Sequence, residues 1–216
     1  MRFRWLVGFP ALLLSALVHA QGVLVLGDSI SAAYGIDKEQ GWVALLQSRL
    51  DEHCSGVAVN NASVSGETTA GGRVRLPALL EQHQPELLII ELGGNDGLRG
   101  LSPVAMEDNL VQMVDAARAA NVPVLLLGMY LPANYGEAYL KLFADVFQRV
   151  AREQGVPLVP FFLEGVGDTP ALMQDDGVHP VADAQPILLE NAWPAIVPLL
   201  PPRCDVPVLA KNGEAS

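Results

Sequence analysis

Five short runs of apolar residues, rich in Val, Ile and Leu, recur along the chain. They are VLVLG (23–27), VAVNNA (57–62), LLIIELG (87–93), VPVLLLG (122–128) and VPLVP (156–160). Within these runs the apolar residues are largely continuous rather than alternating with polar ones, which is typical of strands covered on both faces of a sheet. The pattern therefore predicts five buried β-strands.

Segments with a helical period lie between and after these runs. In GWVALLQSRL (41–50), Trp42, Leu45, Leu46 and Leu50 recur on one face of a helix with 3.6 residues per turn. Segments of similar length and character are found at about 71–83, 103–120, 135–154 and 180–199. Strands that alternate with helices form parallel sheets covered by helices on both faces. We therefore predict an α/β fold with a five-stranded parallel sheet between two helical layers.

The first twenty residues have the pattern of a signal peptide. Arg2 and Arg4 precede an apolar run over 5–18, and Val-His-Ala ends the segment at Ala20. A membrane anchor is the alternative, but the run is short for a span of about 20 residues and no basic cluster follows it. We expect residues 1–20 to be removed on export, which places the mature protein in the periplasm or outside the cell.

Composition and charge limit the remaining possibilities. With 216 residues and 50% hydrophobic content, the chain can bury one full core, and we expect one domain over 21–200 and a C-terminal tail over 201–216. The 13 basic and 24 acidic residues give a net charge of -11, which repels a phosphate backbone. We therefore expect a small-molecule substrate and no nucleic-acid partner. The sequence does not indicate an oligomeric state.

The chain contains two cysteines, Cys54 and Cys204. In an exported protein a pair of cysteines suggests one disulfide, here between the end of an early helix and the C-terminal tail. Two unpaired thiols are the alternative, because sequence alone does not give the distance between them. Two isolated cysteines give little support to a metal site.

Polar clusters follow the first three predicted strands. They are GDS (27–29), SVSGET (63–68) and GGND (93–96), and a late loop, QDDGVHP (174–180), precedes the last predicted helix. An open parallel sheet binds its ligands beyond the carboxyl ends of its strands. These clusters are therefore the candidates for a functional site.

The first cluster offers a nucleophile and the last a base. Ser29 requires a base to attack at neutral pH, and the usual base is a histidine oriented by a carboxylate. Asp176 lies three residues before His179, so its carboxylate can hold one imidazole nitrogen and leave the other for Ser29. Asp175 is the alternative carboxylate. We also expect Ser29 to begin a helix, whose N-terminus favours developing negative charge.

The second and third clusters offer donors for an oxyanion. Gly66 can bring its backbone N–H close to a ligand, and Asn95 can offer a side-chain NH₂. The residues around Ser29 do not form the G-x-S-x-G elbow of α/β-hydrolases. GGNDGLRG lacks the G-K-[ST] ending of a phosphate-binding loop, so we expect no nucleotide cofactor.

The four clusters, in this order, resemble the signature blocks of the SGNH or GDSL hydrolase family. GGNDGLRGL, LPANYG and QDDGVHP are similar to its branch of exported bacterial esterases, which comprises thioesterase I, lysophospholipase and arylesterase. The resemblance covers about residues 22–200. It implies a three-layer flavodoxin-like α/β/α fold and an exported member of the family.

The resemblance also implies a role for each candidate residue. Ser29 would be the nucleophile, His179 the base and Asp176 the acid that orients it. The oxyanion hole would consist of the backbone N–H groups of Ser29 and Gly66 and the side chain of Asn95.

The activity that we expect is hydrolysis of acyl esters and thioesters through an acyl-Ser29 intermediate, with no metal or organic cofactor. Apolar side chains of two loops are candidates for contact with the acyl chain: Leu98, Leu101, Met129, Tyr130 and Leu131. One alternative is a carbohydrate acetylesterase, which would favour an open polar groove. The other is an exported, non-catalytic module that binds a lipid or another envelope partner.

Overall fold

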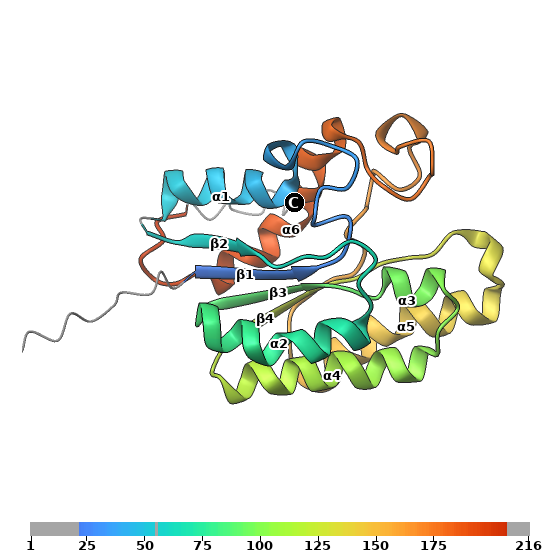
Figure 1. The fold of residues 1–216 in the computed structure, drawn as a ribbon, viewed down its shortest axis with the longest axis horizontal. Helices are drawn as coiled ribbons and strands as arrows, with labels where there is room; N and C mark the ends of the chain where they lie inside the picture. Colours follow the sequence, from blue (N-terminus) through green and yellow to red (C-terminus); the bar gives the residue numbers. More distant parts are fainter. Residues whose placement is uncertain (1–21, 55, 207–216) are drawn as a thin grey trace, which may run out of the picture.

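A computed structural model describes residues 22–54 and 56–206 of the chain. Within these residues, five parallel strands form one sheet in the order β2-β1-β3-β4-β5 (Figure 1). The strands are β1 (Gly22–Gly27), β2 (Ala58–Asn61), β3 (Leu87–Glu91), β4 (Val124–Leu127) and β5 (Leu158–Val159). The predicted parallel sheet is confirmed, and each strand falls within or at the edge of the run that predicted it.

Helices cover both faces of the sheet. They are α1 (Trp42–His53), α2 (Thr69–His83), α3 (Gly94–Leu98), α4 (Pro103–Ala119), α5 (Glu137–Gln154) and α6 (Gln185–Ile196). Short 3₁₀ helices are η1 (Lys38–Gln40), η2 (Ala133–Tyr135), η3 (Pro170–Leu172), η4 (Ala182–Ala184) and η5 (Val197–Leu199). In Figure 1, α1 and α6 pack together on one face, whereas α2, α4 and α5 cover the other. The three-layer α/β/α architecture is therefore confirmed.

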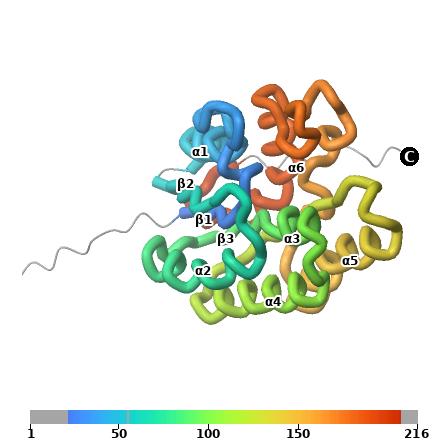
Figure 2. The backbone as a smooth tube through the Cα atoms, turned by 45° about the vertical axis from the view of Figure 1, so that its right-hand side comes forward, coloured from blue at the N-terminus to red at the C-terminus, as the bar shows by residue number. Residues whose placement is uncertain are grey.

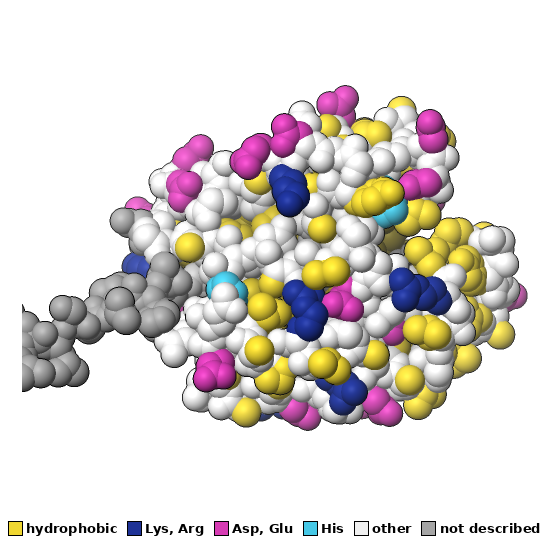
Figure 3. All heavy atoms as spheres, viewed as in Figure 1, with side chains coloured by type: hydrophobic (Ala, Val, Ile, Leu, Met, Phe, Trp, Pro, Cys, Tyr) yellow, Lys and Arg dark blue, Asp and Glu magenta, His cyan; other side chains and the backbone are white. Residues whose placement is uncertain are grey.

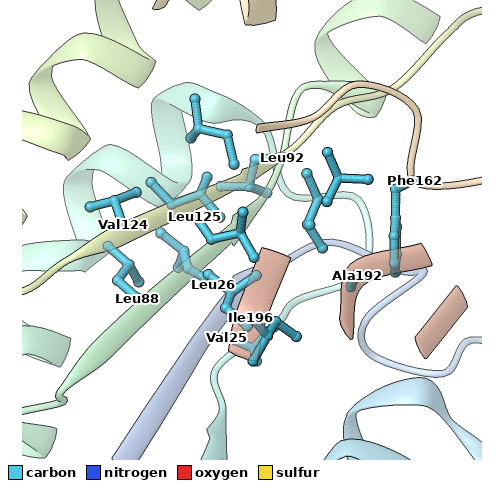
Figure 4. Close-up of a cluster of buried hydrophobic side chains, with 14 of the residues drawn as sticks. Val25, Leu26, Leu88, Leu92, Val124, Leu125, Phe162, Ala192 and Ile196 are labelled. Atoms are coloured by element: carbon cyan, nitrogen blue, oxygen red, sulfur yellow. The ribbon is translucent and has the colours of Figure 1, made fainter. Parts of the chain in front are cut away.

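The apolar residues that form β1, β3 and β4 are buried in the core of the fold. The side chains of residues 23–26 in β1 are fully buried, and burying one Val or Leu stabilises a fold by about 1.5–3 kcal/mol. Figure 4 shows Val25, Leu88 and Leu125 of three neighbouring strands in one cluster with Ile196 of α6. The strand that precedes Ser29 is therefore held on both faces.

Two predicted helices are shorter in the structure because proline and glycine change the backbone near their ends. Prolines lie near the start of α6 and within it, so the segment predicted as 180–199 divides into η4, α6 and η5. The helix α5 begins two residues later than predicted because Gly136, with φ 81°, separates it from η2.

The order of the strands creates a crevice at one end of the sheet. From β1 the chain passes to β2 on one side, and it later returns to form β3 on the other side of β1. Such a reversal of direction leaves space beyond the carboxyl ends of the two strands that flank it. Gly27, the last residue of β1, is in register with Glu91, the last residue of β3, so the segments that follow both strands begin at this crevice.

The C-terminal segment is attached to the early part of the fold. The structure joins Cys54, which directly follows α1, to Cys204 by a disulfide, and the Asp205 N–H donates to the His53 carbonyl (3.0 Å). The predicted signal peptide, residues 1–20, lies outside the described residues, as do residues 207–216 of the predicted tail. None of the helices within the described residues combines the length and the apolar character that a bilayer span requires.

Candidate active site

Ser29 lies in a tight turn directly after β1. The Asp28 carbonyl accepts from the Ala32 N–H (3.0 Å) and the Ser29 carbonyl accepts from the Tyr34 N–H (3.0 Å). Contrary to our expectation, Ser29 does not begin a helix. The reason is Ala33, whose φ of 58° is left-handed and incompatible with continuation of a right-handed helix. The turn instead presents a mostly buried serine hydroxyl at the crevice.

The structure brings Ser29, His179 and Asp176 into one hydrogen-bonded chain. Ser29 Oγ lies 2.8 Å from His179 Nε2, and His179 Nδ1 lies 2.6 Å from Asp176 Oδ2. Figures 1 and 2 show the loop after β1 beside the orange segment that precedes α6. Two segments 150 positions apart in the sequence therefore meet at this site.

The electrostatics of Asp176 determine which imidazole nitrogen carries the proton. The hydrogen bond with His179, followed by those from the Val178 and His179 backbone N–H groups, lowers the pKa of Asp176 to about 2. An ionised carboxylate accepts hydrogen bonds but does not donate them, so Nδ1 of His179 must be the donor. In neutral imidazole this leaves Nε2 free to accept the hydroxyl proton of Ser29.

The loop that carries His179 is held by local and long-range contacts. Asp176 Oδ1 accepts from the N–H groups of Val178 (2.9 Å) and His179 (3.0 Å), a compact turn formed by the carboxylate itself. The Gln174 side chain donates to the carbonyl of Tyr34 (2.8 Å). It thereby ties this loop to the segment that follows Ser29. Sequence reasoning missed Gln174, because a glutamine beside two aspartates belongs to no motif that would indicate its long-range contact.

The three residues proposed as oxyanion donors, Ser29, Gly66 and Asn95, line the same pocket. Gly66 has φ 79°, a left-handed conformation that favours glycine. Among the described residues, none accepts a hydrogen bond from the backbone N–H of Ser29 or Gly66. Asn95 Nδ2 donates one hydrogen to Asp28 Oδ2 (3.0 Å), which leaves its second hydrogen for a ligand.

The helix α3, which carries Asn95, was missed by sequence reasoning because its glycine-rich sequence is typical of a loop. Neighbouring contacts stabilise this helix. Asp96 accepts from the backbone N–H (2.8 Å) and the hydroxyl (2.5 Å) of Thr69 at the start of α2. Arg99, at the other end, donates to the Gly66 carbonyl (2.8 Å). The segments that carry Gly66 and Asn95 are therefore fixed to each other.

A pocket of about 760 Å³ opens beside the serine. Leu98, Met129, Tyr130 and Leu131 line it as predicted, whereas Leu101 does not. Gly100, with φ 64°, turns the chain after α3, and the Leu101 side chain is left exposed. On the face drawn in Figure 3, hydrophobic side chains gather around a hollow at the right of the molecule, with a histidine beside it.

Other apolar residues in the pocket come from loops that sequence reasoning did not consider. Phe161 and Leu163 line the pocket from the segment after β5, and the Phe161 ring stacks on Tyr130 with 4.5 Å between the ring centres. The rule that ligand-binding residues follow strand ends, applied to the fifth strand, would have indicated this segment. The pocket is thus predominantly apolar beyond the serine.

Known proteins are similar to this chain in sequence and in fold. Residues 25–185 match the GDSL-like Lipase/Acylhydrolase family. The chain is 55% identical over 201 residues to the Esterase TesA of Pseudomonas aeruginosa, with 93% of this chain and 100% of that protein covered. It is 45% identical over 200 residues to the Thioesterase 1/protease 1/lysophospholipase L1 of Escherichia coli K12, with 92% and 95% covered. The crystal structure of the esterase EstA from Pseudoalteromonas sp., inhibited by monoethylphosphonate, matches with a TM-score of 0.78 at 42% identity, covering 82% of this chain and 97% of that one.

The hydrogen bond between Asp176 and His179 predicts that activity depends on the Asp176 carboxylate. Replacing Asp176 with Asn should lower kcat for a p-nitrophenyl ester by about 10³- to 10⁴-fold, because an amide neither enforces the same imidazole tautomer nor stabilises the imidazolium. Asp175→Asn is the matched control, since Asp175 makes no hydrogen bond to His179 among the described contacts; it should keep its turnover. Equal losses in the two variants, measured by steady-state kinetics, would contradict the assignment of Asp176.

Proposed function

The chain belongs to the GDSL-like Lipase/Acylhydrolase family, and we propose that it hydrolyses acyl esters and thioesters through a covalent intermediate on Ser29. The single observation that carries this proposal is the hydrogen-bonded chain from Asp176 through His179 to Ser29, which ends at an apolar pocket. The membership confirms the family that the four sequence blocks indicated.

The proposed reaction begins with attack by Ser29. As its oxygen forms a bond to the carbonyl carbon of the substrate, Nε2 of His179 takes the hydroxyl proton. The carbonyl oxygen becomes an oxyanion, which accepts hydrogen bonds from the backbone N–H groups of Ser29 and Gly66 and from the Asn95 side chain. Asp176 stabilises the imidazolium that has formed.

The tetrahedral intermediate then collapses. The bond to the leaving group breaks while His179 returns the proton to the departing alcohol or thiol, and the acyl group remains on Ser29. Water next attacks the acyl carbon, with His179 taking one of its protons and passing it back to the Ser29 oxygen as the acid is released. The proposed steps balance without a metal or an organic cofactor.

The lining of the pocket supports an acyl chain as the group that binds there. Aromatic and aliphatic side chains contribute most of its wall, including the stacked pair of Tyr130 and Phe161. The relatives bear on the leaving group, because one is an esterase and another a thioesterase and lysophospholipase by name. We therefore infer that this protein accepts both oxygen and sulfur leaving groups.

The two alternatives have less support. A carbohydrate acetylesterase would be expected to have an open polar groove, whereas the pocket beside Ser29 is mostly apolar. A non-catalytic binding module would have no need for a serine, a histidine and an aspartate within hydrogen-bond distance of one another.

We also propose that the protein acts in the periplasm or outside the cell after export. The basic and apolar pattern of residues 1–20 supports removal of a signal peptide. The disulfide between Cys54 and Cys204 supports an oxidising compartment.

Covalent labelling tests the proposed nucleophile. A fluorophosphonate should add once to the wild-type protein, because it reacts with activated serines, and Ser29→Ala should gain no adduct in intact-protein mass spectrometry. Ser48→Ala is the matched control, since Ser48 is exposed on α1 and its hydroxyl donates to the Ala44 carbonyl (3.2 Å); it should label like the wild type. Labelling of Ser29→Ala, or a wild-type protein that does not label, would contradict the proposal.

A substrate panel tests the proposed acyl chain. With p-nitrophenyl esters of increasing length, kcat/KM should rise from the acetyl ester by up to about fourfold per buried methylene, since each contributes about 0.8 kcal/mol. A thioester of the preferred length should also be hydrolysed, and acetylated xylan should be a poor substrate. Faster release of acetate from xylan than turnover of any longer ester would favour the carbohydrate alternative instead.

A further inference from the structure

Glu91, the last residue of β3, is a fully buried carboxyl group to which the proposed mechanism gives no role. Its Oε2 accepts from the Ser31 hydroxyl (2.7 Å) and from the Asp28 backbone N–H (3.2 Å). Its Oε1 is buried and has no hydrogen-bond partner among the described residues. Burial of a polar atom without a hydrogen-bond partner is unfavourable for stability and calls for an explanation, and the contacts of Oε2 suggest one.

The two hydrogen bonds to Glu91 bracket the nucleophile. Asp28 directly precedes Ser29, and Ser31 follows it by two positions. The Ser31 oxygen also accepts from Trp42 Nε1 (3.1 Å), an interaction that leaves the Ser31 hydroxyl hydrogen for Glu91. One carboxyl group from β3 therefore holds both sides of the turn that presents Ser29.

Asp28 extends this network to the oxyanion donors. Its Oδ1 accepts from the Ile30 N–H (3.0 Å), and its Oδ2 accepts from Asn95 Nδ2 (3.0 Å). Because one hydrogen of the Asn95 amide is fixed on Asp28, the direction of the other hydrogen is fixed as well. Displacement of Asp28 would therefore displace the side chain proposed to hold the oxyanion.

We propose that Glu91 is a positioning residue, which fixes the turn that carries Ser29 and, through Asp28, the amide of Asn95. This proposal rests on the proposed function, because it concerns the geometry of that reaction. Glu91 touches neither the pocket nor the substrate, since it does not line the pocket. It acts only through residues that do.

The surroundings of Glu91 favour its neutral form. Burial, and then the neighbouring Asp28 carboxylate, raise the pKa of Glu91 well above its usual value. The neighbouring polar groups come from three elements: Asp28 and Ser31 from the turn, Trp42 from α1 and Asn95 from α3; His179 acts on Asp28 from a distance. An ionised Glu91 would place half of its charge on Oε1, which has no donor. Glutamine, which is uncharged and of the same shape, should therefore replace it well.

The experiment compares Glu91→Gln and Glu91→Ala with the wild type. Glu91→Gln retains an oxygen acceptor for Ser31 and Asp28, so it should keep kcat within about threefold. Glu91→Ala removes the acceptor, so kcat should fall on the order of 10- to 100-fold, as for other residues that orient a reacting group. KM should change by less than about threefold, because the acyl pocket is unchanged.

A double-mutant cycle separates positioning from a general effect on the fold. If Glu91 acts partly through Asn95, the loss of kcat in Glu91→Ala/Asn95→Ala should be smaller than the product of the two single losses. Glu107→Ala is the matched control, because Glu107 pairs with Arg149 (2.5 Å) at the interface of α4 and α5, away from the pocket; its kcat should not change. If Glu91→Ala does not fold, Ser31→Ala, which removes one of the two hydrogen bonds, should still lower kcat with KM unchanged.

Three results would overturn the proposal. The first is a wild-type kcat in folded Glu91→Ala, and the second is an equal loss of kcat in Glu91→Gln and Glu91→Ala. The third is a loss of kcat in Glu91→Ala/Asn95→Ala that equals the product of the two single losses. These differ from failure of the proposed function, in which the wild-type protein itself would neither turn over esters nor label at Ser29.

Discussion

The hydrogen bond between the Ser29 hydroxyl and His179 Nε2 is the contact on which the rest of the site depends. It spans 2.8 Å between residues 150 positions apart, so neither loop determines it alone. On one side the fully buried strand β1 fixes the position of the serine turn. On the other, Asp176 and Gln174 fix the histidine loop through hydrogen bonds to its own backbone and to Tyr34. A displacement of about 1 Å can lower the rate of a reaction 100-fold, so the proposed reaction would depend on all of these contacts.

Three carboxyl groups near Ser29 lie in different electrostatic environments. Asp176 is partly exposed and surrounded by N–H donors, and its pKa is lowered to about 2. Asp28 is buried, and the loss of solvent raises its pKa to about 6 despite hydrogen bonds from Ile30 and Asn95. The pKa of Glu91, buried beside Asp28, is also raised well above its usual value. The surroundings of Asp176 therefore stabilise its negative charge, which faces the imidazole. Burial disfavours a negative charge on Asp28 and Glu91, which lie where β1 and β3 end.

Much of this arrangement could be predicted from the sequence, because apolar runs and polar clusters alternate at intervals set by the fold. The five strands, the layers of helices and the positions of Ser29, Asp176 and His179 follow from those patterns and from the family resemblance. The helix α3 could not be predicted, because contacts of Asp96 and Arg99 with distant residues stabilise a glycine-rich segment. Leu101 was predicted to line the pocket but does not, because its apolar character gives no indication of the left-handed turn at Gly100. Glu91 was read as part of a strand, and only the register of β1 and β3 places it beside the serine turn.

The central claim is that Ser29, its base and three N–H donors converge on one reacting carbonyl. A crystal structure of the protein after reaction with a phosphonate ester tests this claim most directly. The phosphorus should be bonded to Ser29 Oγ, with its negatively charged oxygen about 3 Å from the backbone nitrogens of Ser29 and Gly66 and from Asn95 Nδ2. An adduct on another residue, or a phosphonate oxygen that points away from these three donors, would contradict the account.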